Sequence, residues 1–241
     1  MDTLQTRRIT DNLAHIRALE SSPYADDVRV AFFTRYAIDR AGDGVLQVHR
    51  LASDVAGHIE KLLELMAPPP HARVLDVGCG VGDCASLMKA LRSDLHFQLV
   101  NRSRAQLALC PPEFEQIEAD MHSIPLPSAS FDVAMYCYSL GHGLLERALP
   151  EAARVLKPGG VLFIYDVTSE DGTALDERLA YRAHAVRRVQ EEADDAGFSQ
   201  DFCLELPDLD VSHLGKVIGI DAAVRYFSGA RPVIYRFRRR A

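Results

Sequence analysis

RVLDVGCGVGD, residues 73–83, sets the architecture that we expect for the whole chain. Val74, Leu75 and Val77 predict a short buried strand, and the glycines that follow predict a tight turn into a helix. Glycine has no Cβ, so the backbone of such a turn can adopt positive φ and a ligand can lie against its peptide planes. The stretch therefore predicts a ligand-binding turn at the end of a strand, with an unoccupied structural turn as the alternative.

The spacing of the glycines separates two kinds of ligand. A dinucleotide-binding turn has the pattern G-x-G-x-x-G, but Asp83 stands where its last glycine is needed. An acid two residues before G-x-G-x-G instead resembles the first motif of class I S-adenosylmethionine-dependent methyltransferases. The resemblance implies that Gly78, Cys79 and Gly80 hold the methionine part of S-adenosylmethionine, and that Asp76 faces its ammonium group.

Composition limits the remaining possibilities. The 241 residues, 48% of them hydrophobic, are enough for one sizeable core. The net charge of -7 argues against a nucleic-acid partner, because neutralising phosphates requires a dominant basic face. Five cysteines without CxxC spacing favour neither a disulfide framework nor a metal site, as expected in a reducing cytoplasm. No apolar run reaches the ~20 residues of a membrane span, and no signal peptide is recognisable, so we expect a cytoplasmic protein.

A run of prolines divides the chain into two parts. Residues 2–66 show apolar side chains at helical spacing, and Pro68-Pro69-Pro70 would stop the last helix. We therefore expect an N-terminal helical cap or substrate lid over residues 1–70 and an S-adenosylmethionine-binding domain over residues 71–241. Tyr24, Phe33 and Tyr36 would contact an apolar substrate, unless these rings only dock the cap onto the core. Arg40 would contact the substrate by neutralising a diphosphate, if the substrate carries one.

After residue 71, strands and helices alternate, which predicts an α/β fold with a Rossmann-like, doubly wound, mostly parallel sheet. The family resemblance adds that the last strand inserts antiparallel to its neighbours. Ligands of such sheets bind beyond the carboxyl ends of the strands. Seven strands are predicted at 73–77, 96–101, 115–119, 131–139, 161–167, 202–206 and 231–237, and the main helices at 84–93, 146–157 and 174–196.

Polar residues at the ends of the next strands resemble the same family in the same order. Asn101 stands where an acid usually holds the ribose hydroxyls, and the N-x-S-x-x-Q pattern that it begins resembles sterol, cyclopropane and terpenoid C-methyltransferases. A helix N-cap at Ser103 is a compatible structural explanation of that pattern. Asp120-Met121 resembles the pair that contacts adenine. The cofactor contacts implied beyond the glycine turn are Asn101, Arg102, Gln106, Asp120, Met121 and Cys137.

The end of the fourth strand should lie where methyl donor and acceptor meet. Methyl transfer from a sulfonium is an in-line displacement, so the main task of the enzyme is to align the reactants and exclude water. We expect His142 to contact the substrate and act as the base, because its charge changes near neutral pH. A purely structural histidine is the alternative. Tyr138 would supply an aromatic face for a developing cation.

These residues predict a methyltransferase acting on a small, largely apolar metabolite. The sharpest hypothesis is C-methylation of an isoprenoid, such as a prenyl diphosphate, in secondary metabolism; Mg²⁺ would be needed only for a diphosphate. The first alternative is O- or N-methylation of a hydroxylated natural product, and the second is a non-catalytic cofactor-binding module. The expected partner is a small molecule, and the sequence is compatible with a homodimer.

Overall fold

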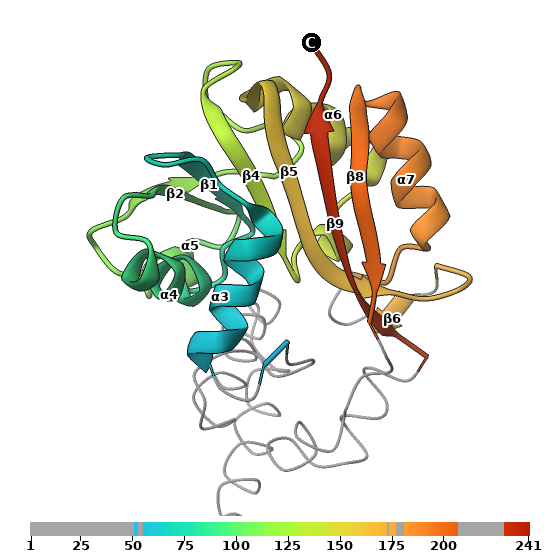
Figure 1. Cartoon of the computed structure of the whole chain (residues 1–241), viewed down its shortest axis with the longest axis horizontal. Helices are drawn as coiled ribbons and strands as arrows, with labels where there is room; N and C mark the ends of the chain where they lie inside the picture. The colour runs from blue at the N-terminus through green and yellow to red at the C-terminus, as the bar shows by residue number, and fades with distance from the viewer. Residues whose placement is uncertain (1–50, 53–54, 173, 177–180, 207–228) are drawn as a thin grey trace, which may run out of the picture.

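The computed structural model describes residues 51–52, 55–172, 174–176, 181–206 and 229–241 (Figure 1). Most of the expected cap lies outside these residues, and so do the substrate contacts predicted for Tyr24, Phe33, Tyr36 and Arg40. The last predicted cap helix is described and confirmed, because α3 spans Val55–Met66 and ends just before the prolines.

A seven-stranded sheet forms the centre of the described fold, in the order β3-β2-β1-β4-β5-β9-β8. Neighbouring strands are parallel, except that β9 runs antiparallel to both β5 and β8. The predicted Rossmann-like sheet with an antiparallel last strand is confirmed. Its strands are β1 Arg73–Val77, β2 His96–Asn101, β3 Glu115–Glu118, β4 Phe131–Cys137, β5 Leu156–Thr168, β8 Phe198–Glu205 and β9 Arg231–Arg239.

Helices cover both faces of the sheet (Figure 1). On one face, α3 and α4 (Asp83–Leu91) pack over a core cluster that includes Val74. On the other, α6 (Leu145–Val155) and α7 (Val186–Asp195) pack over a cluster that includes Leu75. Successive side chains of a strand point to opposite faces, so β1 contributes to both cores. This burial on both sides explains its apolar sequence.

The helix predicted over residues 174–196 is wrong in its first half. Ala174–Asp176 (β6) and Tyr181–Arg182 (β7) instead pair as a small antiparallel sheet, and only the second half forms α7. The Tyr181 hydroxyl donates a hydrogen bond to Asp166 of β5. This tertiary contact holds the segment against the main sheet and outweighs the helix propensity of its residues.

The glycine turn after β1 lies directly against the end of β4. Gly78 has φ of +74°, and a Cβ added to it would lie 2.5 Å from the Ser139 Cβ. The Ser139 hydroxyl donates to the Val77 carbonyl oxygen at 2.6 Å. Both the backbone conformation and the close neighbour therefore require glycine at position 78.

We expect Gly78→Ala to lower the free energy of unfolding by about 2–4 kcal/mol. About 1 kcal/mol comes from the positive φ and the rest from overlap with Ser139. Urea denaturation measures the loss. Gly159→Ala is the matched control, because Gly159 has φ of +76° and its added Cβ would meet nothing within 4 Å. Equal losses in the two variants would show that the contact with Ser139 does not matter.

Candidate functional site

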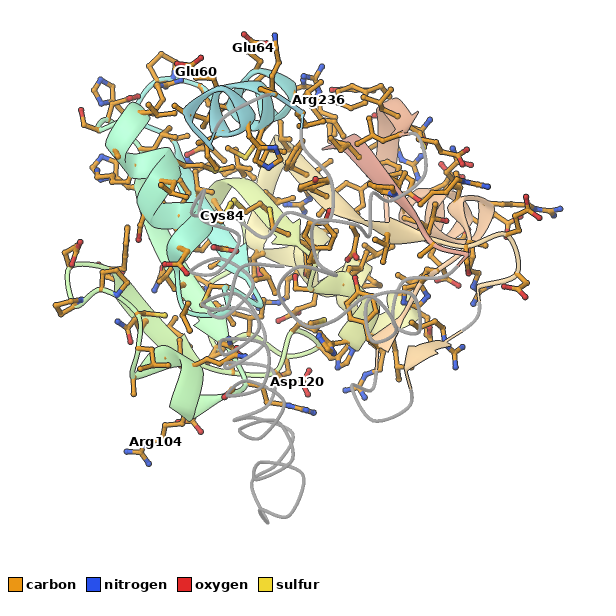
Figure 2. The ribbon with its side chains drawn as sticks, turned by 90° about the horizontal axis from the view of Figure 1, so that it is seen from below. Glu60, Glu64, Cys84, Arg104, Asp120 and Arg236 are labelled. Atoms are coloured by element: carbon orange, nitrogen blue, oxygen red, sulfur yellow. The ribbon has the colours of Figure 1, made fainter. Side chains whose placement is uncertain are left out.

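The strand order reverses at β1, which pairs with β2 on one side and with β4 on the other. In a doubly wound sheet, a crevice for ligands opens beyond the carboxyl ends of the strands at this point. Figure 2 views the molecule from below, looking onto that edge, and labels Cys84 at the start of α4 and Asp120 after β3. Contacts with a cofactor are therefore expected along this edge.

Asp76 is a buried carboxylate with one unsatisfied oxygen. Asp76 is only 1% exposed, and its Oδ2 has no hydrogen-bond partner. Burial raises the pKa of Asp76 to about 7. An unpartnered buried carboxylate is costly unless a positive group reaches it. Asp76 therefore fits the ammonium group of S-adenosylmethionine, as the sequence motif predicts.

Asn101 fastens the glycine turn to the end of β2. Its Nδ2 donates to the Gly80 carbonyl at 3.2 Å and also to Gln106 Oε1. Its Oδ1 accepts from the Ser103 backbone N–H at 2.9 Å. The Ser103 hydroxyl caps α5 (Arg104–Leu107), accepting from the Gln106 N–H at 3.2 Å. The N-cap is confirmed, and contact of Asn101 with a ribose stays a prediction for a side chain already occupied within the protein.

The Gly80 carbonyl oxygen also accepts hydrogen bonds from two thiols. Cys79 Sγ and Cys110 Sγ each lie 3.6 Å from its oxygen. The neighbouring Gln106 is 2% exposed, and its Nε2 has no hydrogen-bond partner. The turn is thus held from inside the protein while the buried amide nitrogen of Gln106 keeps donor capacity for a ligand.

Asp120 is linked to the segment after β4 through a histidine. Its Oδ1 accepts from the His122 backbone N–H at 2.9 Å and lies 2.6 Å from His122 Nδ1. His122 Nε2 in turn accepts from the Leu144 N–H at 2.8 Å. Although burial opposes the effect, hydrogen bonds from His122 and the positive charge of Arg102 lower the pKa of Asp120. Asp120 is therefore an ionised acceptor that is coupled to the loop before α6.

The other predicted cofactor residues take different positions. Arg102 is exposed. Met121 lies against the next loop, because a Cβ added to Gly143 would come within 2.5 Å of its sulfur. Cys137, at the end of β4, has its sulfur 4.0 Å from that of Cys84. The Cys137 side chain thus lies against the start of α4, whereas Met121 lies against the loop before α6.

The segment after β4 carries both predicted catalytic residues. Tyr138 has φ of +52°, a conformation that a bulky side chain rarely adopts. Its ring packs edge-on against Tyr165, with centroids 4.7 Å apart. His142 ends the short 3-10 helix η1 (Leu140–His142) and is exposed. Its ring meets that of Tyr181 edge-on, with centroids 4.8 Å apart.

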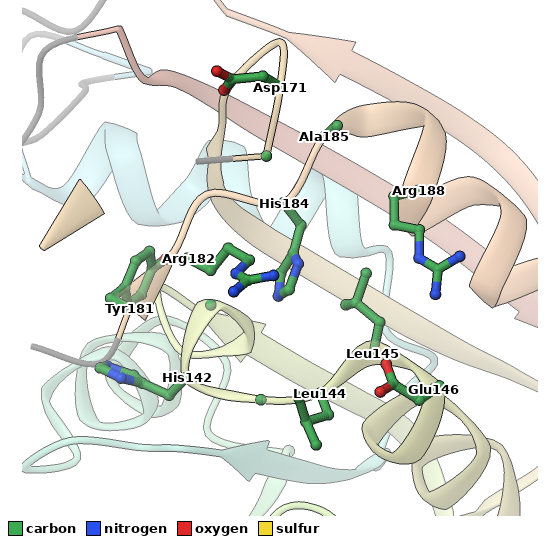
Figure 3. Close-up of a pocket in the computed structure, with 13 residues that line it drawn as sticks. His142, Leu144, Leu145, Glu146, Asp171, Tyr181, Arg182, His184, Ala185 and Arg188 are labelled. Carbon is green, nitrogen blue, oxygen red and sulfur yellow. The ribbon is translucent and has the colours of Figure 1, made fainter. Parts of the chain in front are cut away.

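His142 lines a cavity of about 680 Å³ between the start of α6, the start of α7 and the segment around β7 (Figure 3). The side chains around it are largely polar and include Glu146, Arg182 and His184. Burial lowers the pKa of His184, and its Nε2 has no hydrogen-bond partner. Charged and hydrogen-bonding side chains that converge on one cavity are able to fix the orientation of a polar small molecule.

Two residues beside this cavity, Asp166 and Tyr181, were not identified from the sequence. Asp166 interrupts the apolar run VLFIYDV, much as Asp76 interrupts RVLDV, so a signal for a functional acid was present. Tyr181 gave no such signal, because its segment was predicted as part of a helix.

Within the described ranges, no helix is both long and apolar enough to cross a bilayer. The same part of the chain holds no group of three His, Cys, Asp or Glu side chains placed as metal ligands.

Comparison with known proteins supports the cofactor motif. Residues 75–164 match the family described as a methyltransferase domain. The chain is 33% identical over 135 residues to the S-adenosyl-L-methionine-dependent Diels-Alderase iccD of Talaromyces variabilis, covering 49% of this chain and 44% of that protein. It spans about half the length of the curated relatives that it matches.

Solved structures share the fold over most of the chain. The [4+2]-cyclase SpnF has a TM-score of 0.72 at 21% identity, covering 90% of this chain and 95% of that one. Geranyl diphosphate C-methyltransferase from Streptomyces coelicolor A3(2), solved with Mg²⁺, geranyl-S-thiolodiphosphate and S-adenosyl-L-homocysteine, has a TM-score of 0.69 at 15% identity, covering 91% and 99%. At these identities the likeness concerns the fold.

We expect Asp76→Asn to weaken S-adenosylmethionine binding at pH 8 by at least about tenfold, because a charge-assisted contact is lost. In the unchanged protein a proton competes with the ammonium group, so affinity should fall as the pH drops below about 7, the pKa of Asp76. The variant should lose this pH dependence. Isothermal titration calorimetry from about pH 6 to about pH 8, a range that brackets this pKa, measures both effects.

Asp132→Asn is the control for this experiment. Asp132 is the second residue of β4, at the end of the strand opposite to the candidate site, where it accepts hydrogen bonds from the Arg73 backbone N–H and from Lys157. Its removal should affect stability and leave the affinity and its pH dependence unchanged. Tight, still pH-dependent binding by Asp76→Asn would exclude Asp76 as the ammonium ligand.

Proposed function

We propose that the chain is an S-adenosylmethionine-dependent methyltransferase that transfers a methyl group to a small-molecule acceptor, because residues 75–164 match a family described as a methyltransferase domain. The observation that carries the proposal is the unpartnered, buried Oδ2 of Asp76 beside the turn at Gly78. A carboxylate in such a position is explained by a cationic ligand rather than by stability.

When bound, S-adenosylmethionine supplies an electrophilic methyl group on its sulfonium. The residues of this chain would orient it from the ends of three strands. Asp76 would hold the ammonium group, while Gln106 and Asp120 have donor and acceptor capacity for the adenosine part. Asn101 would act mainly by fixing Gly80. Orientation of this kind is the largest contribution expected for an in-line displacement.

His142 is the proposed base for the acceptor. It is exposed at the edge of the cavity, and its ring orientation is limited by Tyr181. A neutral imidazole at this position would accept the proton of a hydroxyl or amine as the methyl group is transferred. Tyr138, held beside Tyr165 at the end of β4, would present an aromatic surface near the developing positive charge.

The described lining of the cavity supports an oxygen or nitrogen acceptor. Glu146, His184 and Arg182 provide hydrogen-bonding partners of both charge signs, which suit a hydroxylated or amine-bearing molecule better than a bare hydrocarbon. C-methylation of an isoprenoid in secondary metabolism is the second candidate. The shape shared with a geranyl diphosphate C-methyltransferase favours it, and Arg182 and Arg188 would then face a diphosphate, with Mg²⁺.

Cofactor binding without methyl transfer is a further candidate that two comparisons favour. One relative is named a Diels-Alderase and one solved structure a [4+2]-cyclase. In such a reaction the acceptor would rearrange within the cavity while the cofactor remained intact. The two outcomes differ in a single observable, the formation of S-adenosylhomocysteine.

Incubation with methyl-labelled S-adenosylmethionine and a panel of phenols, amino sugars, prenyl diphosphates and polyenes tests these candidates. Label in a phenol or amine would support the first proposal, and label on carbon of a prenyl diphosphate the second. Cyclised polyene without S-adenosylhomocysteine would overturn methyl transfer. Absence of cofactor binding by calorimetry would reject all three.

We expect His142→Ala to lower kcat with an oxygen or nitrogen acceptor by about 10²–10⁴-fold, the usual contribution of a general base. Cofactor affinity should stay within about twofold, because His142 is not among the proposed cofactor ligands. Steady-state kinetics and calorimetry measure these values. His96→Ala is the matched control. His96 is an exposed histidine at the start of β2, at the amino-terminal ends of the parallel strands and therefore opposite to the candidate site. Unchanged turnover in His142→Ala would remove the histidine from the mechanism.

A further inference from the structure

Asp166 gathers several hydrogen-bond donors at the end of β5. It is 5% exposed. Its Oδ2 accepts from the Leu140 backbone N–H at 3.0 Å, at the start of η1. Its Oδ1 accepts from the Val167 N–H at 2.8 Å and from the Tyr181 hydroxyl. One buried carboxyl group thus binds both the turn that carries His142 and the segment that packs over it.

The Tyr181 ring lies directly on that turn. A Cβ added to Gly141 would lie 2.4 Å from Tyr181 Cζ, so only glycine leaves room for the ring at this position. On the same side, the ring meets the His142 imidazole edge-on, with an interplanar angle of 88°. Figure 3 shows Tyr181 and His142 next to each other at one end of the cavity. The histidine is therefore bounded by a ring whose hydroxyl is itself fixed.

We propose that Asp166 and Tyr181 are a positioning pair that fixes the η1 turn and holds the His142 imidazole toward the acceptor. The inference rests on the proposed function, in which His142 is the base. Asp166 acts through other groups: it binds the turn at Leu140 and orients Tyr181, which in turn limits the ring of His142.

The electrostatics of the turn are consistent with this role. Burial raises the pKa of Asp166 to about 7, although backbone N–H donors from Val167 and the η1 turn oppose the shift. Only the ionised carboxylate can accept from all its donors at once. Its charge also favours the protonated form of a nearby imidazole. Among the residues that the structure describes, the other titratable or charged groups near the turn include Cys137 and Tyr138 at the end of β4, His122 with Asp120, and Glu146, Asp171, Arg182, His184 and Arg188 around the cavity.

The test follows the titration of His142 by NMR in the full chain, with selectively labelled histidine and S-adenosylhomocysteine present. In Asp166→Asn the pKa of His142 should fall by at least about 0.5 unit, because a nearby negative charge is removed. In Tyr181→Phe the pKa of His142 should also fall, because Asp166 loses a hydrogen-bond donor and is therefore less ionised. Tyr136→Phe is the matched control: it removes a buried hydroxyl without a hydrogen-bond partner, on β4, and should leave the titration unchanged.

Kinetics provide the second readout. Tyr181→Phe should lower kcat by about tenfold with the dissociation constant of the cofactor unchanged, as expected when the orientation of a base is relaxed. Identical His142 titrations in all variants would overturn the positioning role. If Asp166→Asn does not fold, Tyr181→Phe, which keeps the ring, decides the question alone. Absence of methyl transfer by the wild-type protein would contradict the proposed function. The His142 titrations would still decide whether Asp166 and Tyr181 position this histidine.

Discussion

The close approach of Gly78 to Ser139 is the constraint on which the candidate site depends. The absence of a Cβ lets the turn after β1 touch the end of β4, and the Ser139 hydroxyl then closes the gap by bonding the Val77 carbonyl at 2.6 Å. The two strands flank the point where the order of the sheet reverses. This contact therefore brings the glycine turn and the residues that follow β4, His142 among them, to the same edge.

Two buried carboxylates, Asp76 of β1 and Asp166 of β5, lie on the strands that flank β4, and they differ in their hydrogen-bond partners. Asp166 is supplied with donors from its own chain, including the Leu140 N–H and the Tyr181 hydroxyl. Asp76 keeps an oxygen without a partner. Burial raises the pKa of each to about 7, so both ionised forms are costly to the folded chain. Perturbed acids of this kind cluster at functional sites. The contrast distinguishes an acid that organises the protein from one that is left for a ligand.

Sequence reasoning succeeded where local pattern and tertiary environment agree. The bounds of β1 and β2 were predicted to the residue, because buried parallel strands read as apolar runs that end in glycine or a polar side chain. It failed at Tyr181, where helix-forming residues are held on the sheet by a contact with Asp166, distant in the sequence. Asn101 shows a subtler difference: the motif suggested a ribose ligand, whereas the geometry adds a bond to Gly80 that no spacing reveals.

The insertion of β9 between β5 and β8 has a consequence for biosynthesis. Those two strands never pair with each other, so each exposes an open edge until Arg231–Arg239 emerges from the ribosome and fills the gap. A nascent chain that already carries the glycine turn and the whole of β5 is still an unfinished sheet, with edges that can pair with other chains. Completion of the sheet, and protection from aggregation, must therefore wait for the segment that is translated last among its strands.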